Sequence, residues 1–297
     1  IVKEQGKDLK IIYTPLHGTG NTIAERLLRE LGFKNVYVVP EQEKPDGNFP
    51  TVDYPNPEDK KAFKLALELA KKVDADLVLA NDPDADRIGV HVKDTKTGEY
   101  ILFNGNMIGL MAAEYLISQK REKGLLPENP ALIKTIVSSN MTDKICEVNG
   151  VELYEVLTGF KNIAGKIREF EQANSHKCIM GYEESYGCLI GDHSRDKDEI
   201  IVVMLLSEAD AYYKTKGMTL WDAMQEMYKK YGYYKEGQIV VVKEGADGAA
   251  AIKAKMEELR NNPLNKIGNY EVLKIKDCLN NTIKDLKTGE VKNWDLP

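Results

Sequence analysis

The sequence has few cysteines, and those it has are widely spaced. They lie at Cys146, Cys178, Cys188 and Cys278 and form no Cys-x-x-Cys pair. Neither a zinc site nor a disulfide framework is therefore indicated. Without such a framework, the expected location is a reducing, cytoplasmic compartment. No signal or transit segment opens the chain and no methionine does either, so we expect it to be part of a longer protein.

Long apolar runs and an excess of basic residues are also absent. No run approaches the length of a transmembrane helix, so no membrane partner is expected. The formal net charge is -6, which argues against a nucleic acid held by its phosphates. Any anionic ligand must be bound by local groups. The length of 297 residues, with 42% hydrophobic and 30% charged residues, is typical of a globular protein with two or three domains.

The most informative segment has the sequence Asp-Pro-Asp-Ala-Asp-Arg and occupies residues 82–87, one residue after the apolar run 77–80. Side chains alternate in an extended segment, so Asp82, Asp84 and Asp86 point to one side, where their charges repel unless a cation lies between them. Oxygen-only ligation favours Mg²⁺ over zinc or copper. Arg87 adds a fixed cation, and carboxylates, metal and guanidinium together suit phosphoryl transfer.

An EF-hand loop and a solvated turn are the two alternatives to a magnesium site in this segment. An EF-hand loop starting at Asp82 requires Gly at its sixth position and Glu at its twelfth, where this chain has Arg87 and Lys93. That reading fails. A solvated turn after a strand remains open, because Asp and Pro are common turn residues.

The first hundred residues alternate apolar runs with helical patterns. Strands are expected at 10–13, 36–39 and 77–80, and helices at 21–31 and 58–73, which predicts a parallel sheet covered by helices. The runs 88–92 and 100–103 flank a turn-rich insert and predict an antiparallel hairpin. We place the end of this first domain at residue 103.

A second α/β unit is expected over residues 104–232. Its expected elements are a helix at 106–122, strands at 132–137, 151–157 and 177–180, and helices at 198–216 and 220–230. From residue 233 to 297 we expect a linker and the opening of a third, α+β domain, with a strand from Tyr233 onward, a helix at 249–259 and a strand at 270–275. The closing stretch, 284–297, is rich in turn residues.

In parallel sheets, ligands bind at the carboxyl ends of strands, and four further loops are expected there. Residues 14–20 form a glycine-punctuated turn that either presents N–H groups to an anion or simply joins strand to helix, and the turn fits no nucleotide-binding motif. Residues 181–187 are either a plain glycine-flanked turn or a sugar site, in which Glu183 and Ser185 suit vicinal sugar hydroxyls. Residues 192–198 are either a charged helix entrance or a basic binding segment, and residues 158–161 offer Lys161 to a phosphate.

In this order, the loops resemble those of the alpha-D-phosphohexomutase superfamily, the phosphoglucomutases and phosphomannomutases. The resemblance implies two successive three-layer α/β domains of phosphoglucomutase type, plus the opening of a third domain. It also implies a parent enzyme with a phosphoserine in an N-terminal domain and a phosphate-binding loop in a C-terminal domain. No matching motif for either occurs in these 297 residues, so both domains are expected to be missing partners.

The resemblance further implies roles for single residues. Asp82, Asp84 and Asp86 would hold Mg²⁺, and Arg87 would orient and neutralise the transferring phosphoryl group. Lys197 would position the reacting groups or handle a proton. The implied substrate-binding residues are Gly159, Phe160, Lys161, Glu183, Ser185 and Arg195. The implied reaction of the parent interconverts glucose 1-phosphate and glucose 6-phosphate through a bisphosphate, and the isolated chain is expected to be inactive. Phosphomannomutase, phosphopentomutase and glucose-1,6-bisphosphate synthase activities stay open, as does a non-catalytic module that binds Mg²⁺ and a sugar phosphate.

Overall fold

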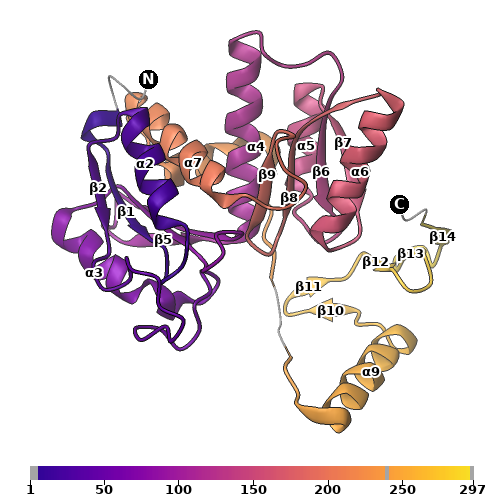
Figure 1. Cartoon of the computed structure of the whole chain (residues 1–297). Coiled ribbons are helices and arrows are strands. Elements are labelled where there is room, and N and C mark those ends of the chain that lie inside the picture. Colours follow the sequence, from indigo (N-terminus) through magenta and orange to yellow (C-terminus); the bar gives the residue numbers. More distant parts are fainter. Residues whose placement is uncertain (1–5, 238–240, 295–297) are drawn as a thin grey trace. The chain divides into compact units, whose positions relative to one another are not determined.

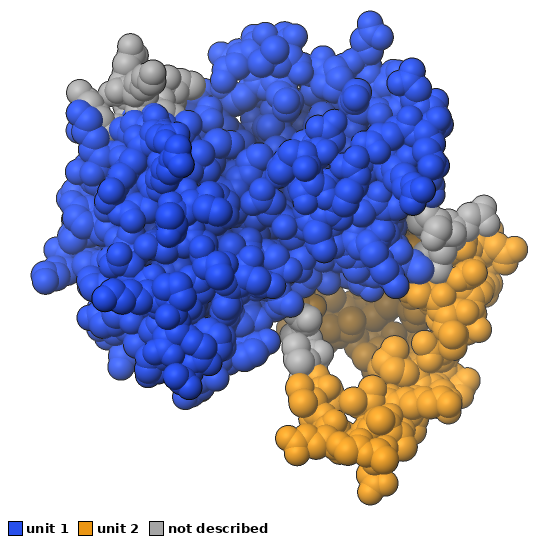
Figure 2. Space-filling model, viewed as in Figure 1, with its two compact units in different colours: residues 1–235 blue, residues 236–297 orange. Residues whose placement is uncertain are grey.

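The computed structural model describes residues 6–237 and 241–294, which fall into two compact units, 1–235 and 236–297 (Figure 2). None of the described helices is long and apolar enough to cross a bilayer. The first unit contains two sheets, each with helices on its faces (Figure 1). These mixed sheets confirm the expected α/β fold.

The first sheet has the strand order β2-β1-β3-β4-β5. Its strands are β1 (Lys10–Thr14), β2 (Asn35–Val38), β3 (Leu77–Asn81), β4 (Ile88–Lys93) and β5 (Tyr100–Phe103). β1 pairs in parallel with β2 and β3, whereas β4 pairs antiparallel with β3 and β5. The hairpin expected around residues 94–98 is therefore present. Every residue of β3 is buried, because helices cover both faces of the sheet.

Helices from both halves of the first unit cover this sheet. They include η1 (Gly6–Asp8), α2 (Asn21–Leu31), η2 (Lys60–Phe63) and α3 (Lys64–Val73). The helix expected over 58–73 was wrong at its start. The side chain of Asp59 accepts a hydrogen bond from the Lys61 N–H and caps a 3₁₀ turn, so the α-helix begins only at Lys64. α3 packs against β1 and β3, and α2 packs against β2 (Figure 1).

The second sheet has the strand order β7-β6-β8-β9. Its strands are β6 (Pro130–Thr135), β7 (Glu152–Val156), β8 (Lys177–Glu183) and β9 (Gly187–Ile190). β6 pairs in parallel with β7 and β8, and β9 pairs antiparallel with β8. The strand expected at 132–137 was misplaced, because the Ser138 N–H bonds to the Thr135 carbonyl and turns the chain. β8 runs on to Glu183, and β9 was not predicted.

Five helices accompany the second sheet, and three of them also contact the first. They are α4 (Gly105–Glu122), α5 (Met141–Asn149), α6 (Phe160–Ala173), α7 (Glu199–Thr215) and α8 (Leu220–Tyr231). α7 contacts β9 and α4, but also α2, β3 and β4. α8 contacts β4, and α4 contacts β5. One apolar cluster therefore joins side chains of both sheets, such as Tyr13 and Tyr182. The domain boundary at residue 103 stays a prediction.

The second unit contains one helix and short antiparallel strands. They are α9 (Gly245–Asn261), β10 (Lys266–Ile267), β11 (Tyr270–Glu271), β12 (Lys274–Asp277), β13 (Thr282–Asp285) and β14 (Val291–Asn293). The strand expected from Tyr233 was wrong for residues 233–237 and 241–244, and its residues 238–240 lie outside the described part of the chain. The strand expected at 270–275 is broken between β11 and β12. There the Val272 N–H donates to the Asn265 carbonyl, and the Leu273 carbonyl accepts from the Leu286 N–H.

Candidate functional site

The aspartate segment, residues 82–87, is the turn between the antiparallel strands β3 and β4. Asp82, Asp84 and Asp86 each offer a carboxylate oxygen, and these oxygens lie within 4.8 Å of one another. Asp82 is buried, Asp86 is half-buried and Asp84 is exposed. The structure thus brings the three side chains together, but the expected extended segment was wrong, because the Ala85 N–H bonds to the Asp82 carbonyl at 3.0 Å and Ala85 has φ 59°, which makes a turn.

Hydrogen bonds fix the aspartate segment without any cation. Asp82 Oδ1 accepts from the backbone N–H groups of Asp86 at 3.0 Å and Arg87 at 2.9 Å. The Asn81 amide donates to the Arg87 carbonyl at 2.9 Å and accepts from the Tyr13 hydroxyl at 2.9 Å. The segment is therefore held in place by β1 and β3 before a ligand arrives.

The buried carboxyl of Asp82 is electrostatically strained in the absence of a cation. Burial, together with the charges of Asp86 and Asp84, raises its pKa to about 7, although the Arg87 N–H bond opposes the shift. A bound divalent cation would remove this repulsion. Because all the donors are oxygens, the site fits Mg²⁺ better than a nitrogen- or sulfur-seeking metal.

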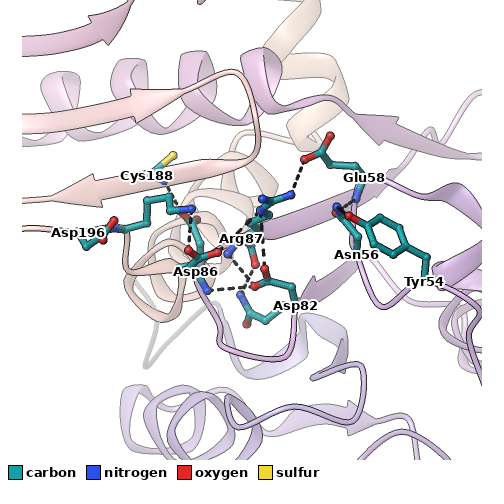
Figure 3. Close-up of polar contacts among 11 residues, drawn as sticks. Tyr54, Asn56, Glu58, Asp82, Asp86, Arg87, Cys188 and Asp196 are labelled. Carbon is teal, nitrogen blue, oxygen red and sulfur yellow. Dashed lines mark hydrogen bonds and ion pairs between the residues drawn. The ribbon is translucent and has the colours of Figure 1, made fainter. Parts of the chain in front are cut away.

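Two cationic side chains border the aspartates (Figure 3). Lys197 Nζ lies 2.6 Å from Asp86 Oδ2. Arg87 Nη1 donates to Glu58 Oε1 at 3.0 Å, whereas its Nε lies 3.8 Å from both Asp82 Oδ2 and Asp86 Oδ1. A Cβ on Gly187 would lie only 2.3 Å from Lys197 Cδ, so the missing side chain at residue 187 gives the lysine its path to Asp86.

The turn between β8 and β9 carries Glu183 and Ser185 and adjoins the aspartate segment. The Ile88 N–H donates to the Tyr186 carbonyl at 3.1 Å, which ties this turn to the start of β4. Glu183 is 7% exposed, and its Oε1 accepts from the Gly159 N–H at 2.8 Å. Burial raises the pKa of Glu183, opposed by that hydrogen bond and by Lys197. Ser185 is half-buried.

The remaining predicted residues lie in the segments 159–161 and 192–198. Gly159 precedes α6 with φ 105°, which explains a glycine there, and Lys161 is exposed. Phe160 is 5% exposed and packs in the core beneath α6, so only its backbone can reach a ligand. Arg195 pairs with Glu171 and donates to two backbone carbonyls, so its charge is partnered on the α6 side.

The glycine-punctuated turn at residues 14–20 supports the aspartate segment. The Thr19 N–H and hydroxyl donate to the Pro83 carbonyl at 2.8 and 3.0 Å. A Cβ on Gly18 would lie 2.3 Å from Pro83 Cα, so glycine permits this approach. The His17 and Gly18 N–H groups bond to Gln42 and Pro15. These N–H groups are occupied, which favours the plain strand-to-helix connection over an anion site.

Sequence reasoning missed two carboxylates of this region, Glu58 and Glu199. Glu199 is fully buried at the start of α7, where its side chain accepts a hydrogen bond from the Cys188 N–H and its own N–H donates to the Ala85 carbonyl at 3.3 Å. Burial raises its pKa well above the usual value, with smaller contributions from Asp198 and Asp82. No local motif marks either residue, because each reaches the aspartate segment through tertiary contacts.

Comparison with known proteins gives matches across the chain. Two family models match, "Phosphoglucomutase/phosphomannomutase, alpha/beta/alpha domain II" over residues 1–97 and "domain III" over residues 104–231. A phosphoglucomutase of Staphylococcus haemolyticus (strain JCSC1435) is 38% identical over 270 residues, which cover 91% of this chain and 48% of that protein. The chain spans about half the length of the curated relatives it matches.

Solved structures share the fold. The Paramecium pp63/parafusin phosphoglucomutase in its open form aligns with a TM-score of 0.61 and 18% identity, covering 97% of this chain and 47% of its own. An N-acetylphosphoglucosamine mutase of Aspergillus fumigatus, in complex with GlcNAc-6P and magnesium, aligns with a TM-score of 0.50 and 16% identity, covering 77% and 48%.

Proposed function

Because the chain belongs to the phosphoglucomutase/phosphomannomutase family, we propose that it forms the cation- and sugar-phosphate-binding part of a phosphohexomutase. The observation that carries the proposal is the meeting of three aspartates, Arg87 and Lys197 beside the Glu183 turn. In the whole protein, these groups would serve the interconversion of a hexose 1-phosphate and a hexose 6-phosphate, with glucose as the sugar.

In this proposal, Asp82, Asp84 and Asp86 hold Mg²⁺. The all-oxygen donor set and the raised pKa of Asp82 support the assignment, as does the magnesium in the Aspergillus complex. When bound, the cation would supply positive charge beside the reacting phosphoryl oxygens. The aspartates position it at the end of β3.

Arg87 and Lys197 supply the organic cations of the proposed site. Arg87 neutralises and orients phosphoryl oxygens, since a guanidinium donates several hydrogen bonds in one plane. Lys197 lies 2.6 Å from Asp86 and positions the reacting groups or handles a proton. Such fixed charges contribute to phosphoryl transfer mainly by stabilising the transition state.

The sugar would bind at the neighbouring turn. Glu183 accepts hydrogen bonds from sugar hydroxyls, and Ser185 both donates and accepts. Gly159 donates its N–H to Glu183, and we propose that the backbone of Phe160 and the side chain of Lys161, which follow it, also bind the sugar phosphate. Arg195 would have to exchange its Glu171 partner to bind a phosphate.

The parent protein would supply the rest of the active site. We propose that the parent's phosphoserine and phosphate-binding loop lie in segments that correspond to the unmatched half of the relatives. This chain alone would then bind ligands without turnover. The domain limits 1–103, 104–232 and 233–297 belong to this proposal. So does a cytoplasmic location, which is compatible with four free thiols.

Titration calorimetry of the chain with Mg²⁺, with and without glucose 6-phosphate, tests the proposal. The wild type and an Asp53→Asn variant, which changes an exposed aspartate, should bind Mg²⁺, whereas Asp84→Asn should not. A coupled dehydrogenase assay should detect no conversion of glucose 1-phosphate by this chain. Failure of the wild type to bind Mg²⁺ would refute the cation site, and turnover would refute the assignment of the nucleophile to another segment. Comparing glucose, mannose and ribose 1-phosphates on the intact parent would identify the sugar.

A further inference from the structure

The segment before η2 carries a carboxylate that faces the site, and its backbone is held firmly. Asn56 is 7% exposed. Its Oδ1 accepts from the Glu58 N–H at 2.8 Å, and its Nδ2 donates to the Tyr54 hydroxyl at 3.2 Å (Figure 3). Prolines at positions 55 and 57 restrict the backbone on both sides of Asn56. The backbone that carries the Glu58 side chain is therefore held in place.

The same segment is fitted against β4, the strand that follows Arg87. A Cβ on Gly89 would lie 2.7 Å from Pro57 Cβ and 2.6 Å from Phe63 Cζ. The absence of a side chain at Gly89 thus lets Pro57 approach the strand. Because Arg87 immediately precedes β4, the segment that carries Glu58 and the residue it faces are both anchored to one strand.

The guanidinium of Arg87 lies between the carboxylate of Glu58 and those of two aspartates. On one side, Nη1 donates to Glu58 Oε1 at 3.0 Å. On the other, Nε is 3.8 Å from the nearest oxygens of Asp82 and Asp86, beyond hydrogen-bonding distance. Nη2 donates no hydrogen bond to any residue within 6–237 and 241–294. The side chains of Arg87 and Glu58 are each about one-third exposed, at 33% and 32%.

We propose that Glu58 is a positioning residue for Arg87, an inference that rests on the proposed cation and phosphate site. Glu58 holds the guanidinium away from the aspartates, so their oxygens stay available to a divalent cation. The same contact leaves Nη2 free to donate to an anionic oxygen. Without Glu58, Arg87 would still lie close to the carboxylates of Asp82 and Asp86 and would compete with the cation for them.

A double-mutant cycle on the whole 297-residue chain tests this inference, with Mn²⁺ as the probe and calorimetry as the readout. Glu58→Ala should weaken Mn²⁺ binding about tenfold, the size of coupling expected between contacting charged groups. In an Arg87→Ala background, the same substitution should change the affinity less than about twofold. An equal loss in both backgrounds would mean that Glu58 acts only as a distant negative charge, and would overturn the proposal.

Two controls separate positioning from folding. Glu30→Ala breaks the exposed Arg26–Glu30 pair on α2 and should leave Mn²⁺ affinity unchanged. Glu58→Gln retains an acceptor for Arg87 but loses the charge, so it should weaken Mn²⁺ binding less than Glu58→Ala. Circular dichroism should show that all variants are folded. If the Gln variant weakens binding as much as the Ala variant, the contact with Arg87 does not carry the effect.

An NMR measurement without metal tests this inference separately from the proposed function. The ¹⁵N–¹H side-chain signals of Arg87, identified by their loss in Arg87→Ala, report the Glu58 contact directly. They should shift and exchange faster with solvent in Glu58→Ala but not in Glu30→Ala. Unchanged Arg87 signals would overturn the positioning role. A wild-type chain that binds no Mn²⁺ would instead overturn the proposed cation site, with the Arg87 signals still deciding the role of Glu58.

Discussion

Replacing Asp82 with Asn separates the electrostatic cost of the aspartate segment from its hydrogen bonds. Asn keeps an oxygen in the place of Oδ1, which accepts from the N–H groups of Asp86 and Arg87. It removes the negative charge that lies against Asp84 and Asp86. We expect the cation-free protein to become more stable and the stabilisation by Mg²⁺ to disappear.

The size of the effect follows from the pKa of Asp82, which is about 7 instead of the usual 3.8. A raised pKa means that the folded state binds the proton more tightly than the unfolded state does, so the stability falls as the pH rises from 3.8 to about 7. At 1.36 kcal/mol per unit, the loss is at most about 4 kcal/mol. The stability of the Asp82→Asn variant should not show this fall with pH.

The assay is urea unfolding between pH 5 and 8, in EDTA and again in Mg²⁺, with Asp53→Asn as the control. In EDTA at pH 8, Asp82→Asn should require more urea than the wild type. In Mg²⁺ the wild type should gain stability and Asp82→Asn should not. The reasoning is refuted if Asp82→Asn is the less stable protein in EDTA at pH 8, or if Mg²⁺ stabilises both proteins equally.

Four other substitutions give separate checks. Asp84→Ala should leave the melting temperature nearly unchanged, because the residue is exposed, and should abolish metal-dependent turnover of the intact parent; retained turnover contradicts the metal role. Gly187→Ala places a Cβ 2.3 Å from Lys197 Cδ and should cost about 1–3 kcal/mol in urea unfolding. Gly165→Ala, whose new Cβ would point into open space outside its own helix, should instead stabilise α6 by about 0.5–1 kcal/mol; equal effects would refute the packing argument. Glu199→Gln should flatten the fall in stability above pH 4.5, since the pKa of Glu199 is raised above that value; an unchanged pH profile would refute it.

The regular elements were predictable where a local signal is strong. The bounds of α2 match the prediction, because apolar spacing defines the helix and Gly32, with φ 104°, ends it. The run 77–80 was identified as a strand because uninterrupted apolar residues suit burial on both faces. In contrast, β9 starts with Gly187 and Cys188, which carry little strand preference, and it depends on pairing with β8.

The candidate site was predictable only in part, for a similar reason. Asp82, Asp84 and Asp86 do meet, as their spacing by two led us to expect, but they converge in a turn with Ala85 at φ 59° and not by alternation along an extended segment. The contact between Glu58 and Arg87 joins residues 29 positions apart and has no local pattern. Phe160 also shows the limit, since sequence alone did not indicate that its side chain lies in the core.

Anomalous diffraction from crystals grown with Mn²⁺ would test the cation site most directly. The account predicts a strong peak at the end of β3, at about 2.1–2.2 Å from one oxygen each of Asp82, Asp84 and Asp86. The peak should vanish in Asp84→Asn crystals. No peak there at saturating Mn²⁺, or a peak bound by other residues alone, would contradict the account.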